Sequence, residues 1–147
     1  MYKAELLTID DADAILDVEL HIQAEPLSLG IIQSCFGRFY KAFGIFAEQE
    51  LIGYAIWQNV CGDASLINIA VKQQHQGKGV AKALMQAGLD WCRATDAQEI
   101  WLEVRVSNTQ AIKLYERCEF IEHSIRENYY PTKKGSEDAL VMVLILV

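Results

Sequence analysis

The stretch Gln74-His75-Gln76-Gly77-Lys78-Gly79 decides the interpretation of this chain, because it joins a predicted strand to a predicted helix. An apolar run at residues 66–71 precedes it, and a helical pattern at residues 80–91 follows it. Two glycines one residue apart let the backbone turn tightly and leave its N–H groups uncovered by side chains. The start of a helix adds more unbonded N–H groups and the positive end of its dipole. The stretch therefore predicts a cradle for phosphate oxygens.

The chain downstream of this loop carries a second set of polar residues in predicted secondary structure. Residues 100–105 are predicted as a strand, and side-chain alternation places Glu103 on the face opposite the apolar residues. Asn108 is suited to cap the next helix, whose apolar stripe includes Tyr115. From the pattern alone, Glu103 is either a functional carboxylate or an ion-paired strand residue. Tyr115 is either functional or a core tyrosine.

The remaining periodicity predicts a single α/β domain over residues 1–147, with a mixed, mostly antiparallel sheet covered by helices. Asp10 or Asp11 should cap the first helix, and Pro26 should end it. The other expected elements are strands at 2–7, 43–47, 51–60, 120–129 and 138–146, a short helix at 29–38, and turns at 48–50 and 61–63.

Composition and charge exclude several classes of protein. Hydrophobic residues make up 52% and charged residues 22% of the chain, which is typical of a folded protein and not of a disordered one. The net charge of −7 argues against a nucleic-acid partner, because phosphate backbones require clustered lysine and arginine. The longest apolar run, residues 139–147, falls far short of the ~20 residues that span a bilayer, and the N-terminus has no signal core. We therefore expect a cytoplasmic protein without membrane contact.

The cysteines are widely spaced and show no metal-ligand pattern. They are Cys35, Cys61, Cys92 and Cys118. Their spacing predicts free thiols, and neither a disulfide framework nor a metal site.

Four segments carry a resemblance to a known family: Asn68-Ile69-Ala70-Val71, Trp101-Leu102-Glu103-Val104-Arg105, Arg126-Glu127-Asn128-Tyr129-Tyr130-Pro131 and Glu137-Asp138-Ala139. Together with the glycine loop they resemble the acetyl-CoA-dependent GNAT N-acetyltransferases. More narrowly, they resemble the RimI family, which acetylates the N-terminal alanine of a small-subunit ribosomal protein. The resemblance covers nearly the whole chain and is strongest from residue 66 onward. It implies the GNAT fold, with a mixed sheet of about seven strands flanked by about four helices.

The resemblance also implies catalytic roles for two residues. Glu103 matches the position of the base that takes the proton of the acceptor amine. Tyr115 matches the position of the acid that protonates the leaving thiolate of coenzyme A. A phenol with an ordinary pKa near 10 suits that step. The implied co-substrate is acetyl-CoA, and no metal is implied.

The expected cofactor contacts come from the end of one strand, the glycine loop and the following helix. Backbone groups of Ile69, Ala70 and Val71 should pair with the pantetheine arm and polarise the thioester oxygen. The pyrophosphate should be held by Gln76, Gly77, Lys78, Gly79, Val80, Ala81 and Lys82, with Asn108 as a further cofactor contact.

The acceptor is expected to be the basic N-terminus of a ribosomal protein, and the oligomeric state stays open. Tyr129 and Tyr130 should form the acceptor-side wall, or else be strand-edge aromatics that pack on the sheet. The chain departs from the family at Leu27, where tryptophan is usual, and at Glu119, where glycine is usual. An acetyltransferase for another peptide terminus or a small amine is the alternative. A non-catalytic acetyl-CoA-binding module is the alternative from another class.

Overall fold

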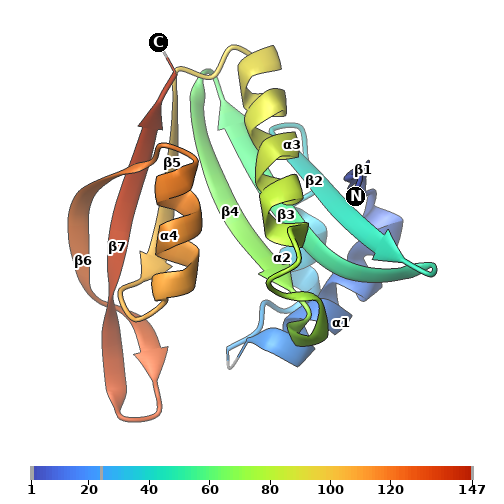
Figure 1. The fold of residues 1–147 in the computed structure, drawn as a ribbon, viewed down its shortest axis with the longest axis horizontal. Helices are drawn as coiled ribbons and strands as arrows, with labels where there is room; N and C mark the ends of the chain where they lie inside the picture. Colours follow the sequence, from blue (N-terminus) through green and yellow to red (C-terminus); the bar gives the residue numbers. More distant parts are fainter. Residues whose placement is uncertain (1, 24, 147) are drawn as a thin grey trace.

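The computed structural model describes residues 2–23 and 25–146 and has a seven-stranded mixed sheet at its centre (Figure 1). The strands lie in the order β1-β2-β3-β4-β5-β7-β6, and all neighbours are antiparallel except β4 and β5. The strands are β1 (Glu5–Leu6), β2 (Tyr40–Ala47), β3 (Glu50–Val60), β4 (Asp63–Val71), β5 (Glu99–Arg105), β6 (Ile121–Thr132) and β7 (Gly135–Ile145). The helices are α1 (Ala12–Ile22), α2 (Leu29–Ser34), α3 (Val80–Ala94) and α4 (Thr109–Arg117), with short 3-10 turns η1 (Ile9–Asp11) and η2 (Gln73–His75). The predicted mixed, mostly antiparallel sheet with four helices is confirmed.

Helices cover both faces of the sheet (Figure 1). On one face, α3 and α4 pack over a core that includes Trp57, Leu84 and Ile100. On the other face, α1 and α2 cover a smaller core that includes Ile15 and Tyr54. Both cores form because strand side chains alternate between the two faces, so that each face can bury an apolar layer. None of the helices in the described ranges has the length and apolar character needed to cross a bilayer.

The parallel strands β4 and β5 pair over a short stretch and then part. Register is kept at residues 63–65 of β4 and residues 99–101 of β5. Beyond that point β4 continues to Val71 and β5 continues to Arg105 with no ladder between them in the described structure. Two facing strand edges are therefore left unpaired in the middle of the sheet, which leaves their N–H and C=O groups available to a ligand.

The first strand and the second helix are shorter than predicted, and Asp11 takes the predicted N-cap position of α1 without a side-chain cap hydrogen bond. The first strand, expected at residues 2–7, pairs with β2 at Glu5 and Leu6, as is common for a short edge strand. The second helix ends at Ser34 and not at residue 38. Asp11 makes no cap hydrogen bond to α1; its carboxylate accepts the N–H of Thr8 at 2.8 Å in a capping box on η1. The extended backbone of Thr8 makes it the better cap residue.

Glu119 follows α4 in the left-handed region of backbone space, with a φ of 74°. The N–H of Glu119 donates to the carbonyl of Glu116 at 2.9 Å. The N–H of Phe120 donates to the carbonyl of Tyr115 at 3.0 Å, which closes the last turn of the helix. This conformation is one that glycine adopts easily, which agrees with the glycine usual at this position in the family. A side chain costs about 1 kcal/mol there compared with glycine.

Glu119→Gly should therefore raise the free energy of unfolding by about 1 kcal/mol. For a chain of this size the melting temperature should rise by ~3 °C. Urea titration and a thermal melt measure both quantities. As a control, Glu116→Gly places glycine inside the regular part of α4 and should cost about 1 kcal/mol. Equal or lower stability of Glu119→Gly would show that the positive φ stores no strain.

Candidate active site

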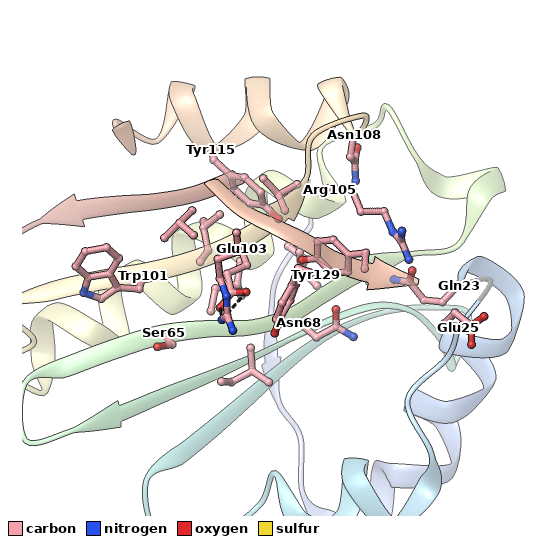
Figure 2. A pocket seen from close by; sticks show the side chains of 18 of the residues that line it. Gln23, Glu25, Ser65, Asn68, Trp101, Glu103, Arg105, Asn108, Tyr115 and Tyr129 are labelled. Carbon is pink, nitrogen blue, oxygen red and sulfur yellow. Dashed lines mark hydrogen bonds and ion pairs between the residues drawn. The ribbon is translucent and has the colours of Figure 1, made fainter. Parts of the chain in front are cut away.

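A cleft of about 860 Å³ opens where β4 and β5 part (Figure 2). Its walls come from the end of α1 and the following turn, from β4, β5 and β6, and from α4 and its cap. Of the residues singled out from the sequence, the cleft brings together Ile69, Glu103, Asn108, Tyr115, Tyr129 and Tyr130. The other polar residues that line it include Glu19, Gln23, Glu25, Ser65, Asn68, Arg105, His123 and Arg126.

Glu103 projects from β5 into the cleft, and its side chain is 30% exposed. Nη1 of Arg126 lies 3.0 Å from Oε1 and 3.1 Å from Oε2 of Glu103. A carboxylate has about four lone-pair sites, so this contact leaves room for another donor. Glu103 is therefore ion-paired, as one of the two alternatives predicted, and it also faces the cleft, so its functional role stays a prediction.

Tyr115 reaches the cleft from α4, on the face of the sheet that α3 and α4 cover (Figure 2). The residue is 4% exposed, and its burial raises the pKa of the phenol well above the ordinary value, with smaller contributions from Tyr130 and Cys118. Within the described residues, its hydroxyl forms no side-chain hydrogen bond. The phenol is thus held neutral, and its O–H is free to donate to a ligand in the cleft.

Tyr129 and Tyr130 form one wall of the cleft near the end of β6. Their rings meet edge to face, with centroids 4.9 Å apart and planes at 79°. Burial, followed by the negative charge of Glu103, raises the pKa of Tyr130 to about 12. The guanidinium of Arg105 lies 4.6 Å from the Tyr130 ring centroid and 3.2 Å from the Glu137 carboxylate. This wall therefore offers aromatic faces held in place by cations.

The glycine loop has the geometry expected of an anion cradle. Gly77 and Gly79 have φ values of 74° and 94°, and an added Cβ at either position would meet no atom within 4 Å. At the start of α3, the N–H of Ala83 donates to the carbonyl of Gly79 at 3.1 Å. In the described part of the chain, the N–H groups of residues 77–82 form no backbone hydrogen bond. Residues 77–82 do not line the cleft. In this loop and the first turn of α3, Lys78 and Lys82 are exposed and Val80 is buried.

The exposed edge of β4 presents alternate backbone groups. Lys72 donates its N–H to a carbonyl of β3 at 2.8 Å, so Ala70, two residues earlier, also turns its N–H and C=O toward β3. Ile69 and Val71 turn theirs toward the gap. The amide of Gln76 donates to the Val71 carbonyl at 2.9 Å and so ties the loop to the strand. The expectation that Ala70 offers free backbone groups is therefore corrected, because the β3 ladder already engages them.

A buried carboxylate beside the turn that bears Leu27 was missed in the sequence. Glu19 is 1% exposed and accepts hydrogen bonds from the hydroxyl of Tyr54, from the amide of Asn68 at 2.8 Å and from the N–H of Leu27 at 2.9 Å. These bonds join α1, β3, β4 and the turn that bears Leu27. The signal was present, since Glu19 lies four residues after Ile15 within the apolar stripe of α1.

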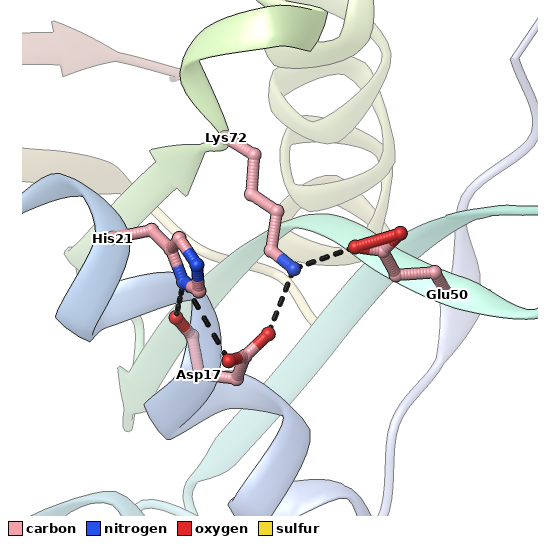
Figure 3. A network of polar contacts seen from close by, with 4 residues as sticks. All are labelled: Asp17, His21, Glu50 and Lys72. Atoms are coloured by element: carbon pink, nitrogen blue, oxygen red, sulfur yellow. Dashed lines mark hydrogen bonds and ion pairs between the residues drawn. The ribbon is translucent and has the colours of Figure 1, made fainter.

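A second buried charge fixes the end of β4 (Figure 3). Lys72 is 3% exposed, and its Nζ lies 2.7 Å from the carboxylates of both Asp17 and Glu50. The hydrogen bonds that Lys72 donates to these carboxylates raise its pKa, and the bond to Asp17 lowers the pKa of that carboxyl. His21 bonds to the carbonyl of Asp17 at 2.7 Å, outside the cleft. The network anchors the strand from which the glycine loop departs.

The histidines and cysteines form no cluster with metal-ligand character. No group of three or more His, Cys, Asp or Glu side chains in residues 2–23 and 25–146 could hold a metal ion. The four cysteines are free, as predicted. His123 packs edge-on against Trp101 in the cleft, with ring centroids 4.8 Å apart.

Comparison with known proteins gives one consistent result. The model of the acetyltransferase (GNAT) family matches residues 11–120. The chain is 38% identical over 138 residues to the ribosomal protein bS18-alanine N-acetyltransferase of Escherichia coli (strain K12), covering 94% of this chain and 93% of the relative. It is 36% identical over 144 residues to the enzyme of the same name from Salmonella typhimurium (strain LT2), covering 98% and 97%. The crystal structure of the Escherichia coli ribosomal-protein-S18-alanine N-acetyltransferase matches with a TM-score of 0.93 at 37% identity, covering 99% of this chain and 94% of that one.

Gly79→Leu should weaken acetyl-CoA binding at least tenfold, about 1.4 kcal/mol. The leucine has to adopt a φ of 94° at the start of α3 and would cover N–H groups that are now open. Isothermal titration on folded protein measures the dissociation constant. Gly135→Leu is the matched control, since Gly135 also has a positive φ and open space around an added Cβ but is the first residue of β7, beside the β6–β7 turn. Unchanged affinity in Gly79→Leu would move the pyrophosphate site elsewhere.

Proposed function

Because this chain belongs to the GNAT acetyltransferase family, in its RimI branch, we propose that it acetylates the N-terminal α-amine of a small-subunit ribosomal protein that begins with alanine. The chain is an acetyl-CoA-dependent N-acetyltransferase. The observation that carries the proposal is that Glu103 from β5 and Tyr115 from α4 line one cleft at the unpaired edge of β4. A carboxylate and a neutral phenol in one cleft are the base and the acid that amine acetylation requires.

The residues of the glycine loop fit a nucleotide pyrophosphate. The free N–H groups of residues 77–82 and the positive end of the α3 dipole favour phosphate oxygens. The outward N–H and C=O of Ile69 can pair with an extended amide-bearing arm as an added strand would. Acetyl-CoA supplies the acetyl group as a reactive thioester. The outward N–H groups at the end of β4 would stabilise negative charge on its carbonyl oxygen.

Glu103 and Tyr115 would divide the proton transfers between them. Glu103 takes a proton from the acceptor ammonium, so that the neutral nitrogen can form the new C–N bond to the acetyl carbon. As the C–S bond breaks, Tyr115 gives its proton to the leaving sulfur, the new amide nitrogen loses its second proton to solvent, and the tyrosinate takes a proton back from solvent. The burial that raises the pKa of Tyr115 keeps it in the protonated form before the step and favours its return to that form afterwards.

An α-amine suits this site better than a lysine side chain. An α-amine has a pKa of about 7.8 and a lysine amine one of about 10.4, so near neutral pH roughly one α-amine in ten is uncharged against fewer than one lysine in a thousand. A single carboxylate such as Glu103 can therefore remove the proton of an α-ammonium more easily than that of a lysine ammonium. The net charge of −7 also favours a basic protein as the acceptor.

A second candidate is an acetyltransferase for another peptide terminus or a small amine. It is favoured by Leu27, which lines the cleft where the family usually has tryptophan. A leucine occupies less space there, so the first residue of the acceptor could be larger. A module that only binds acetyl-CoA is disfavoured, because binding requires neither Glu103 nor Tyr115 in the cleft.

The acceptor is tested with labelled acetyl-CoA and a panel of peptides and amines, with products identified by mass spectrometry. A peptide that begins with alanine and continues with arginine should be acetylated at its α-amine. The same peptide with a blocked terminus and added lysines should react much more slowly. Rates should fall with salt, as expected for a cationic ligand and an acidic protein.

The matched control for the chemistry is Glu103→Gln, which keeps the size of the side chain but removes the base. It should bind acetyl-CoA like the wild type and lose roughly 10²–10⁴ in turnover. Equal rates on the alanine peptide and on the blocked peptide, or activity confined to polyamines, would contradict the ribosomal acceptor. A Glu103→Gln rate within about threefold of wild type would contradict the role of the base.

Tyr115→Phe deletes the hydroxyl that makes no side-chain bond in the described chain, so stability should change by at most about 1 kcal/mol. If Tyr115 is the acid, the chemical step in single-turnover kinetics should slow by roughly 10²-fold or more. An acid must be protonated, and its pKa is raised, so wild-type turnover should show no loss from Tyr115 ionisation until above the ordinary tyrosine pKa of about 10. Tyr40→Phe, with its ring against the α1 and α2 core, is the control. A Tyr115→Phe enzyme that melts early but reacts normally would make Tyr115 a core residue only.

A further inference from the structure

In the cleft, the carboxylate of Glu103 contacts a cation from the chain itself. Nη1 of Arg126 lies within 3.1 Å of both carboxylate oxygens of Glu103. The same guanidinium lies 4.2 Å from the ring centroid of Tyr129. A carboxylate beside an aromatic face is a favourable site for a positive charge. In the proposed reaction the acceptor ammonium has to approach this same carboxylate.

Arg126 is held there by contacts that are easily exchanged. Its side chain is 54% exposed, and β6 is an edge strand. The β6–β7 register shifts between Arg126 and Tyr130, and Asn128 between them has a φ of 55°. An exposed ion pair contributes about 0–1 kcal/mol. The guanidinium can therefore leave Glu103 without disturbing a buried core.

What the acceptor offers to the displaced guanidinium differs between two classes of amine. A guanidinium has five N–H donors and no acceptor, so it is satisfied by carbonyl oxygens. A peptide terminus brings backbone carbonyls within reach of its ammonium group. A polyamine brings only further cations, and the cleft already holds a second guanidinium, that of Arg105. Like charges in a confined site repel one another.

We propose that Arg126 is a specificity-determining residue: it occupies the place of the acceptor ammonium on Glu103 and yields it to amines that carry neighbouring carbonyl groups. The inference rests on the proposed function, in which Glu103 receives the ammonium proton. It deepens that function, because it explains how a site for one ammonium group distinguishes a peptide terminus from a simple polyamine.

Arg126→Gln tests the inference through a ratio of rates. The value of kcat/KM is measured for an alanine-starting peptide and for spermidine, in the wild type and in the variant. In the variant, spermidine should gain about tenfold relative to the peptide. The gain should appear in KM, since the barrier removed is one of access. Arg126→Lys keeps the charge but loses the planar donor fork, so it should fall between the two and serves as a second variant if Arg126→Gln does not fold.

Arg38→Gln is the matched control. Arg38 also lies over an aromatic ring, 5.3 Å from the Phe39 centroid, but it is away from the cleft. Its ratio of rates should equal that of the wild type. A wild type that prefers the peptide, together with an unchanged ratio in Arg126→Gln, would overturn the inference alone. A wild type that prefers spermidine would overturn the proposed acceptor as well. A fall in kcat for both amines by the same factor would also overturn the inference, because Arg126 would then serve to position Glu103.

Discussion

The divergence of β4 and β5 is the constraint on which the rest of the site depends. These strands form the single parallel pair among the described strands, and they stay in register at residues 63–65 and 99–101 before they part. A sheet that stayed closed would satisfy its backbone groups internally and leave no opening through its middle. The opening lets a side chain from α4 on one face and side chains of β5 and β6 on the other share one cleft. The carboxylate of Glu103 and the phenol of Tyr115 belong to opposite layers of the molecule, and they meet at this opening.

Much of the fold was predictable because it rests on local rules. The glycine loop was predictable from two glycines, which take the positive φ values that glycine tolerates. The alternation of buried and partly exposed residues in β5 follows from strand geometry alone. The position of Asn108 as a helix cap is equally local, and its side chain accepts the N–H of Ala111 at 3.2 Å. Such features are decided within a few residues of the sequence. The roles of Glu103 and Tyr115 were suggested by family resemblance and not by pattern, because an alternating carboxylate or a stripe tyrosine has ordinary structural explanations.

What the sequence did not reveal depends on partners far apart in the chain. The contact between Arg126 and Glu103 spans two strands, and β6 shifts its register near Glu122 and after Arg126. Simple alternation counted along β6 therefore loses track of which side chains face the cleft. The Glu19 cluster likewise joins residues from α1, β3 and β4. A charged residue inside an apolar stripe shows that a buried partner must exist, but not which residue it is.

Helix α1 carries two carboxylates that hold different parts of the site. Asp17 forms an ion pair with Lys72 at the end of β4, where the glycine loop begins. Glu19, two residues later, accepts a hydrogen bond from the N–H of Leu27 in the wall of the cleft. A rigid helix moves as one body, so a shift of α1 on nucleotide binding would be passed directly to the opposite wall. Such communication is reciprocal by thermodynamic necessity: if the first ligand improves the fit of the second, the second improves the first to the same degree. Asp17 and Glu19 therefore link, through one short helix, the strand end beside the glycine loop to the turn that bears Leu27.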